Sequence, residues 1–223
     1  IKALKKLKNS FNNSFNLAVE HIVKCQSKVI LCGVGKSGLN ANKIAATFSS
    51  VGTPSFYLSA SNSSHGDLGS ISKKDILILI SYSGKTSELK NIIQYANRNK
   101  ILLIGIMSKK DSILYKASDI KLIIPEVKES GGIVPTSSTT AQLALGDALA
   151  ISSMHYKKFG KLDFKKIHPA GNLGVQLKTV QDIMLTGNKI PFVKEDLKMK
   201  TAIKILSEKR LGILVVQNKL KKT

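Results

Sequence analysis

With 223 residues, the chain is long enough for one α/β domain with its own hydrophobic core and a smaller appendage, but not for two full domains. Apolar residues make up 43% of the chain and charged residues 22%, which excludes an intrinsically disordered protein. The formal net charge is +21, but the lysines are spread along the chain and are not interleaved with aromatic residues. We therefore favour solvated basic faces, and we expect neither nucleic acid nor a membrane as a partner.

Cys25 and Cys32 are the only cysteines, and both lie in apolar surroundings near a predicted strand. This placement indicates the reducing cytoplasm and argues against a disulfide framework or a metal cluster. No apolar stretch approaches the roughly 20 residues that a membrane-spanning helix requires, and the N-terminus has no features of a signal peptide. Because the sequence begins at Ile1 and not at methionine, it is consistent with a fragment of a longer protein.

The first predicted element is an amphipathic helix over residues 4–24, where apolar side chains recur at helical spacing between lysines and asparagines. Residues 28–35 form a short apolar run that ends in glycines, and helical patterning resumes over residues 37–50. This order indicates a strand, a turn and a helix.

The same unit recurs along the chain. Further apolar runs predict strands at residues 54–58, 75–80, 101–107 and 120–124, and helical patterns cover residues 86–97 and 139–157. Because apolar strands alternate with helices, the sequence predicts an α/β fold with a parallel sheet flanked by helices on both faces.

The pattern of predicted elements changes after residue 177. A short segment at Val180–Met184 is followed by a loop through Pro191, a helix over residues 201–209 and a strand over residues 212–216. We therefore predict two domains, a first at residues 1–177 and an incomplete second at residues 178–223.

Three polar turns follow predicted strands, at the carboxyl ends where open α/β sheets bind ligands. The first, Gly33–Gly38, superficially resembles a nucleotide-binding P-loop. That motif needs four residues between its first glycine and a Gly-Lys pair, and only one is present here, so we reject a nucleotide site of that kind.

The other two turns are rich in hydroxyl groups. The turn at Ser81–Glu88 leads from a strand into a helix, and Pro135–Thr140 opens the long helix. Hydroxyls beside the free N–H groups and positive dipole end of a helix suit a phosphate dianion. Any single Ser or Thr is more simply an ordinary helix cap, but two such clusters in one chain favour a phosphate ester.

These segments together resemble the SIS (sugar isomerase) domain, and in particular its arabinose-5-phosphate isomerase branch. The resemblance runs from about residue 27 to residue 184. It rests on Gly33–Gly38, Lys43–Phe48, Gly52–Phe56, Ser64–Gly69, Ser83–Gly84 with Glu88, Pro135–Thr140, Leu143–Ala150, and His168–Pro169 with Leu173–Gly174. It implies a flavodoxin-like three-layer sandwich. The tail resembles most of the first of two CBS motifs, so a nucleotide site between paired motifs cannot be assembled within this chain.

The resemblance implies an aldose–ketose isomerase that interconverts D-arabinose 5-phosphate and D-ribulose 5-phosphate, feeds lipopolysaccharide synthesis and needs no redox cofactor. It also implies four catalytic residues, Lys36, Glu88, Glu129 and His168. The reaction moves a proton between adjacent carbons through an enediol, so it needs a base and a proton donor to the oxygens. We expect Glu88 or Glu129 to be the base, Lys36 to stabilise the enediolate or pair with the phosphate, and His168 to open the sugar ring or shuttle protons.

The remaining contacts with substrate are also implied by the resemblance. The expected substrate-binding residues are Ser37, Gly52, Thr53, His65, Ser81, Ser83, Thr86, Ser137, Ser138 and Thr139. Alternatives remain for several candidates. Glu88 lies where a carboxylate complements a helix dipole, Glu129 lies in a polar loop where most glutamates are solvated, His65 fits an ordinary turn, and Lys36 is one lysine among many.

The chain departs from the family pattern at several positions. The family's His-Pro-x-Glu stretch reads Ser59–Asn62 here, so we expect no metal site. A family histidine is replaced by Leu39 and a family glutamate by Lys85. Two alternatives stay open. One is a non-catalytic phosphosugar-sensing module, because SIS domains also serve as ligand sensors in regulators, and the other is an inactive remnant, which the shortened tail and the lost His-Pro-x-Glu stretch favour. Because SIS relatives build their sites between subunits, the resemblance implies a homodimer or homotetramer.

Overall fold

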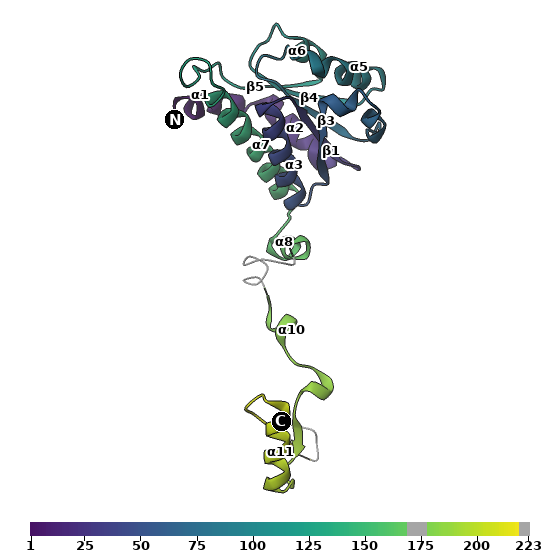
Figure 1. The fold of residues 1–223 in the computed structure, drawn as a ribbon, viewed down its shortest axis with the longest axis vertical. Helices are drawn as coiled ribbons and strands as arrows, with labels where there is room; N and C mark the ends of the chain where they lie inside the picture. Colours follow the sequence, from purple (N-terminus) through teal and green to yellow (C-terminus); the bar gives the residue numbers. More distant parts are fainter. Residues whose placement is uncertain (169–177, 219–223) are drawn as a thin grey trace. The chain divides into compact units, whose positions relative to one another are not determined.

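The computed structural model describes residues 1–168 and 178–218 (Figure 1). The chain divides into two compact units, residues 1–169 and 170–223, and each is described by itself. The predicted boundary at residue 177 lies outside the described residues and stays a prediction, as do the Pro169 and Leu173–Gly174 parts of the family resemblance.

A five-stranded parallel sheet forms the centre of the first unit, with the strand order β2-β1-β3-β4-β5. Its strands are β1 (Val29–Gly33), β2 (Ser55–Ser59), β3 (Ile76–Ile80), β4 (Leu102–Met107) and β5 (Ile120–Ile123). Every residue of β1 and β3 is buried, which explains why these strands are continuous apolar runs in the sequence. The predicted α/β fold with a parallel sheet is confirmed.

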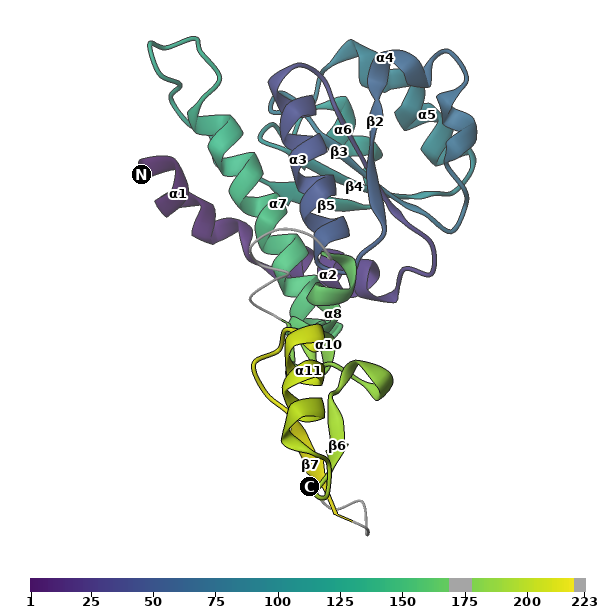
Figure 2. The ribbon, with the colours of Figure 1, turned by 60° about the horizontal axis from the view of Figure 1, so that its bottom comes forward.

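Helices cover both faces of the sheet (Figures 1 and 2). One face carries α1 (Lys2–Leu7), α2 (Asn13–Lys24), α3 (Lys36–Ser50) and α7 (Ser137–Tyr156). The opposite face carries α4 (Ala60–Ser63), α5 (Lys90–Arg98) and α6 (Ile113–Ala117). Alternate residues of β3 enter the two cores, Ile78 on the α3 side and Leu77 and Leu79 on the α5 side. The result is the three-layer arrangement expected from the sequence.

The direction in which strands are added to the sheet reverses between β1 and β3, and the space at the carboxyl ends of these two strands is called the crevice below. The chain leaves β1 through α3 on one face of the sheet, and it leaves β3 through α5 on the other. The two connections therefore diverge at the carboxyl ends of neighbouring strands. Open α/β sheets of this order bind ligands at this switch point.

Glycines allow α3 to pack closely against its neighbours. A Cβ atom on Gly38 would lie 2.7 Å from the carbonyl oxygen of Gly33, and one on Gly146 would lie 2.2 Å from the Ile44 side chain. Contacts this short require the backbone or the side chain to move. The glycines of the first turn and of the long helix are thus needed for the packing of α3 between β1 and α7.

The first 24 residues do not form the single helix predicted from their periodicity. The structure has α1, a short 3-10 helix η1 (Lys8–Ser10) and then α2. The Asn12 side chain accepts a hydrogen bond from the Ser14 N–H (2.9 Å) and so begins a new helix. Ser10 donates to the carbonyl oxygen of Ile123 (2.6 Å), which fixes the break against the end of β5.

Smaller differences concern helix ends. The predicted helix at 86–97 consists of a 3-10 turn, η3 (Ser87–Leu89), followed by α5, and a second 3-10 turn, η2 (Asp67–Ser70), follows α4. The long helix α7 begins at Ser137, two residues before its predicted start. A short helix, α8 (Lys161–Ile167), follows it.

The second unit contains a β-α-β arrangement. Its elements are α10 (Val180–Ile183), the 3-10 turn η4 (Gly187–Lys189), β6 (Phe192–Lys194), α11 (Met199–Lys209) and β7 (Val215–Gln217). Strands β6 and β7 pair in parallel. Among the described residues, no helix has the length and apolarity that crossing a membrane would require.

Candidate functional site

The turn after β1 places Lys36 at the start of α3, on the surface at the carboxyl edge of the sheet. Its neighbour Ser37 does not point freely into the crevice, because its hydroxyl donates to the Oε1 atom of Gln142 (3.2 Å). Asn40 donates to the same oxygen (3.1 Å) and to the carbonyl oxygen of Thr139 (2.8 Å). These bonds tie the first turn to α7 through Gln142, which is fully buried.

The turn after β3 gathers hydroxyl groups around a tight glycine. The Oγ atom of Ser81 lies 2.8 Å from Oγ1 of Thr86 and accepts a hydrogen bond from the Gly84 N–H (3.0 Å). Ser83, which is exposed, accepts from the Lys85 N–H (3.2 Å). Gly84 has φ +63°, and a Cβ there would lie 2.2 Å from Oγ of Ser112. The turn thus contains three hydroxyls, of which the Ser81 hydroxyl is buried, and requires glycine at its centre.

Glu88 lies at the end of this turn, in the 3-10 helix η3, with its side chain exposed. Its Oε2 atom accepts a hydrogen bond from the Ser87 hydroxyl (2.8 Å). A hydrogen bond from its own backbone N–H lowers the pKa of the Glu88 carboxyl below its ordinary value, and the hydrogen bond from Ser87 adds a smaller lowering. The site therefore contains an ionised carboxylate that faces solvent in the single chain.

Glu129 occupies the N-terminus of α7. Its Oε2 atom accepts hydrogen bonds from the backbone N–H groups of Thr136 (2.9 Å), Ser137 (2.8 Å) and Ser138 (3.3 Å). Burial raises the pKa of Glu129, but the hydrogen bonds from Ser138 and from the three N–H groups outweigh that effect and lower it. Glu129 is therefore a helix-capping carboxylate, and the alternative of a solvated loop glutamate is wrong.

The third turn consequently differs from the one after β3. We expected hydroxyls and free N–H groups at Pro135–Thr140 to receive a phosphate, but the Glu129 carboxylate already binds those N–H groups. The Thr139 hydroxyl donates to the carbonyl oxygen of Thr136 (2.9 Å), and Ser138 is buried. In this structure the start of α7 is thus not an open anion site.

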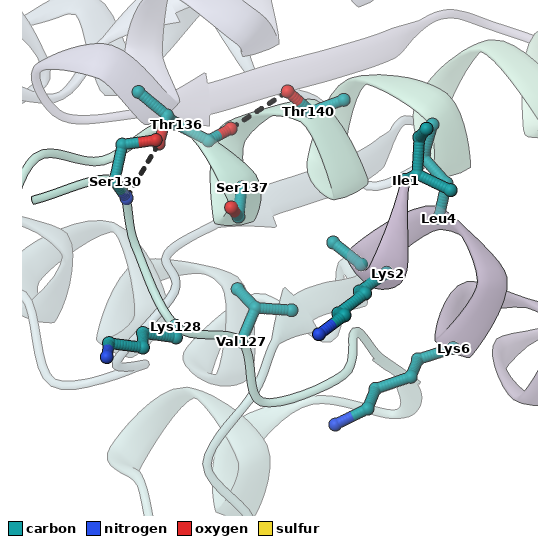
Figure 3. A pocket seen from close by; sticks show the side chains of 11 residues that line it. Ile1, Lys2, Leu4, Lys6, Val127, Lys128, Ser130, Thr136, Ser137 and Thr140 are labelled. Atoms are coloured by element: carbon teal, nitrogen blue, oxygen red, sulfur yellow. Dashed lines mark hydrogen bonds between the residues drawn. The ribbon is translucent and has the colours of Figure 1, made fainter. Parts of the chain in front are cut away.

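A cavity of about 580 Å³ lies beside the start of α7 (Figure 3). It is lined by the first residues of the chain, by residues 127, 128 and 130, and by Thr136, Ser137 and Thr140. No residue of the turns after β1 and β3 lines it. The cavity is therefore separate from the crevice at the strand switch point.

Of three further candidates, His65 lies apart from Gly52 and Thr53. His65 is exposed in the segment after β2, at the carboxyl edge of the sheet. Gly52 and Thr53 precede β2 and so lie at the opposite edge. There Thr53 accepts a hydrogen bond from Lys157 (2.9 Å), and a Cβ on Gly52 would lie 2.4 Å from the Phe159 ring. Within one chain, Gly52 and Thr53 do not join the crevice.

His168 is also distant from the other catalytic candidates in the single chain. It ends α8, where its ring stacks on Phe164 with 3.7 Å between ring centroids and its Nδ1 atom lies 2.9 Å from the Phe164 carbonyl oxygen. Helix α8 follows the C-terminal end of α7, whose 20 residues span about 30 Å. Lys36, Glu88 and Glu129 thus share the carboxyl edge of the sheet, whereas His168 follows the far end of α7.

The family departures have local structural roles. Ser59 accepts a hydrogen bond from the Asn62 N–H (3.5 Å) and begins α4. Lys85 forms an ion pair with Asp111 (2.6 Å), beside the turn after β3. Leu39 is 71% exposed on the first turn of α3.

Two residues near the site were missed in the sequence analysis. Gln142 is a single amide within an Ala- and Leu-rich helix, and that contrast was a usable signal for a buried polar role. Tyr82 accepts a hydrogen bond from the Val127 N–H (3.1 Å) and donates one to the Val127 carbonyl oxygen (3.4 Å). No sequence signal separates Tyr82 from its hydroxyl-bearing neighbours, because its partner is 45 residues away.

Comparisons with known proteins give a family match and several similar proteins. The family model of the SIS domain matches residues 22–152. The chain is 42% identical over 218 residues to "Arabinose 5-phosphate isomerase KdsD" of Yersinia pestis, covering 96% of this chain and 66% of that protein. It is 43% identical over 225 residues to the protein of the same name in Francisella tularensis, covering 98% and 69%. The chain thus spans about two thirds of the length of these relatives.

A solved structure of the E. coli CFT073 protein c3406, in complex with arabinose 5-phosphate, has the same fold. It is 37% identical in sequence, has a TM-score of 0.70, and covers 75% of this chain and 92% of its own. The match covers the sheet domain of a protein that was solved with a phosphosugar.

Proposed function

This chain belongs to the SIS domain family, and on that premise we propose that it interconverts D-arabinose 5-phosphate and D-ribulose 5-phosphate. The relatives and structural neighbours named above support an isomerase. The observation that carries the proposal is the hydroxyl turn Ser81–Thr86 at the β1/β3 switch point, with Lys36 on the neighbouring turn.

The phosphate of the sugar binds at the turn after β3. Ser83 and Thr86 offer hydroxyls near the start of η3, and the buried Ser81 holds the turn through Gly84 and Thr86. The carboxylates near this turn bind groups beside the Ser83 and Thr86 hydroxyls: Glu88 accepts from its own N–H and from the Ser87 hydroxyl, and Asp111 pairs with the Lys85 side chain. At the start of α7, by contrast, the Glu129 carboxylate itself binds three backbone N–H groups. A dianion at this position gains charge-assisted hydrogen bonds.

The proton transfer is assigned to the carboxylates and to Lys36. A base removes the proton from C2 of the aldose while the carbonyl oxygen on C1 takes up a proton, which gives the enediol; return of a proton to C1 and loss of the O2 proton give the ketose. We assign Glu88 as the base, because its carboxylate is exposed at the end of the turn after β3, whereas the Glu129 carboxylate is engaged by three backbone N–H groups at the start of α7. Lys36 stabilises the charge that develops on the oxygens.

We further propose that His168 enters the site from a second copy of the chain, as a homodimer or homotetramer allows. The support is its position in α8, beyond the far end of α7 from Glu129. Mixing a Glu88→Gln variant with a His168→Ala variant tests this arrangement. Activity that reappears only in the mixture supports a shared site, and a mixture as inactive as its components contradicts it.

The main experiment is turnover. The purified chain is incubated with arabinose 5-phosphate in D2O, and NMR follows both ribulose 5-phosphate and deuterium at the carbon next to the carbonyl. Ketose formation with deuterium incorporation supports the enediol route, and a Glu88→Gln variant should abolish both. Binding without turnover would favour a phosphosugar sensor, and neither would favour an inactive remnant.

The finer biological setting is also part of the proposal. We propose a cytoplasmic enzyme that supplies arabinose 5-phosphate for the eight-carbon acid sugar of lipopolysaccharide; the names of the relatives support the isomerase part of this proposal. No redox cofactor is required, because the reaction has no net change in oxidation state.

A further inference from the structure

Tyr82 lies between the two serines of the turn after β3, but its side chain leaves that turn. It is half-buried and packs against the core that β3 shares with α3 and α7. Its hydroxyl reaches Val127, where it accepts from the N–H (3.1 Å) and donates to the carbonyl oxygen (3.4 Å). One side chain thus connects the proposed phosphate turn to the segment that precedes Glu129.

Residues 124–129 form neither helix nor strand, and of these Ile124 is buried in the core. Ser130 follows, whose N–H donates to Oγ1 of Thr136 (3.2 Å) and which pairs with Val134 in an isolated bridge. Gly131 and Gly132, both with positive φ, come next. The segment is anchored at its start by the Ile124 N–H, which donates to the carbonyl oxygen of Met107 (2.9 Å). Between that anchor and Glu129, side chains attach the segment through Tyr82 to Val127 and through an ion pair of Lys109 with Glu126 (2.7 Å).

The two attachments differ in strength. Both partners of the Lys109–Glu126 ion pair are exposed, with 42% of the Lys109 side chain and 65% of the Glu126 side chain accessible to solvent. Solvent therefore screens their attraction. The Tyr82 hydroxyl binds both polar groups of one backbone residue in a half-buried setting, where an unpaired group is costly. The backbone of Tyr82 is itself fixed, because its carbonyl oxygen accepts from the Ser108 N–H (2.9 Å).

We propose that Tyr82 is a positioning residue, whose hydroxyl holds the Val127 segment so that Glu129 stays bound to the start of α7. The catalytic part of this inference rests on the proposed isomerase function. The structural part, that the Tyr82 hydroxyl keeps Glu129 on the N–H groups of Thr136, Ser137 and Ser138, does not.

The test uses Tyr82→Phe, which removes the hydroxyl and keeps the ring in the core. The matched control is Lys109→Met, which breaks the exposed ion pair to the same segment. Hydrogen–deuterium exchange is followed at the amides of residues 136–138 and, as an internal reference, at β3 and β4. In Tyr82→Phe we expect exchange at residues 136–138 to accelerate about tenfold with the reference unchanged, and in Lys109→Met less than about twofold.

Turnover gives the second readout. With arabinose 5-phosphate, Tyr82→Phe should lower kcat about tenfold while KM stays within about twofold, because the hydroxyls of Ser81, Ser83 and Thr86 are retained. Unchanged exchange at residues 136–138, or an increase shared by β3 and β4, would overturn the proposal. Hydrogen–deuterium exchange requires no substrate, so it tests the role of Tyr82 in holding Glu129 even if the chain has no isomerase activity. Failure of the Tyr82 proposal can therefore be told apart from failure of the proposed isomerase function.

Discussion

Two helix entrances in this molecule have nearly the same sequence character and different structures. Ser81–Thr86 and Pro135–Thr140 both place several hydroxyls before a helix, at the carboxyl edge of one sheet. At the first, the hydroxyls bond to one another and to the turn backbone around Gly84. At the second, the Glu129 carboxylate binds the N–H groups. The anion capacity of a helix N-terminus depends on whether the chain already supplies an anion.

The largest effect should follow from Gly84→Ala. Gly84 has φ +63° and a Cβ would lie 2.2 Å from Ser112, so the substitution combines backbone strain with a clash. We expect a loss of about 2–5 kcal/mol in the free energy of unfolding, and at least about tenfold in kcat/KM. Urea denaturation and turnover measure both.

Gly131→Ala is the matched control in the loop before the second entrance. Gly131 also has positive φ (+61°), but no atom outside its immediate neighbours lies within 4 Å of the position that its Cβ would take. We expect Gly131→Ala to lower the free energy of unfolding by about 1–2 kcal/mol, the cost of a left-handed backbone conformation for alanine, and to change turnover little. Equal losses of unfolding free energy in Gly84→Ala and Gly131→Ala would contradict the conclusion that Gly84 is required by close packing against Ser112.

The second comparison removes one hydroxyl from each entrance. Ser83→Ala should raise the KM for arabinose 5-phosphate about tenfold, because a hydrogen bond to a charged phosphate is lost. Ser137→Ala should change KM by less than about twofold, because its entrance is occupied by Glu129. A larger effect from Ser137 than from Ser83 would reverse the assignment of the phosphate site.

The third comparison tests Glu129 as a cap. Glu129→Gln should lower the free energy of unfolding by about 1 kcal/mol near pH 7, because a charged acceptor is replaced by a neutral one. The pKa of Glu129 is lowered in the folded chain, so this stabilisation is present above the ordinary glutamate pKa of about 4.3 and is lost as pH falls through the folded value. Urea denaturation at pH 7 and pH 3 should therefore show the difference between variant and parent shrinking in acid.

Glu126→Gln provides the control for that measurement. Glu126 pairs with Lys109 on the surface, so its loss should cost less than about 0.5 kcal/mol. A pH-independent effect of Glu129→Gln, or an effect no larger than that of Glu126→Gln, would contradict the capping role.

The sheet was predictable from the sequence because its central strands β1 and β3 are buried along their whole length. Their continuous apolar runs, such as Ile76–Ile80, indicate buried strands, and the glycine-containing turns that follow mark where these two strands end. The break between α1 and α2 was not predictable in the same way, since Phe11 and Phe15 continue the helical spacing across it. Asn12 ends the pattern through a side-chain cap that periodicity does not detect.

The site was predictable in its residue types more than in its arrangement. Lys36, Glu88 and Glu129 do lie at one edge of the sheet, because each follows the carboxyl end of a strand. Glu129 reaches the start of α7 through a loop with two glycines of positive φ. The hydrogen bonds of Tyr82 join it to Val127, which is 45 residues away in the sequence. Neither leaves a local sequence signal. The position of His168 depends on the length of α7 and on which copy of the chain it serves.

Amide NMR during a titration with arabinose 5-phosphate decides whether the turn after β3 or the start of α7 receives the phosphate. We expect saturable shifts at the amides of Ser83, Gly84, Lys85 and Thr86, with the amides of residues 136–138 unchanged. Shifts confined to residues 136–138, with the turn after β3 unaffected, would contradict this expectation.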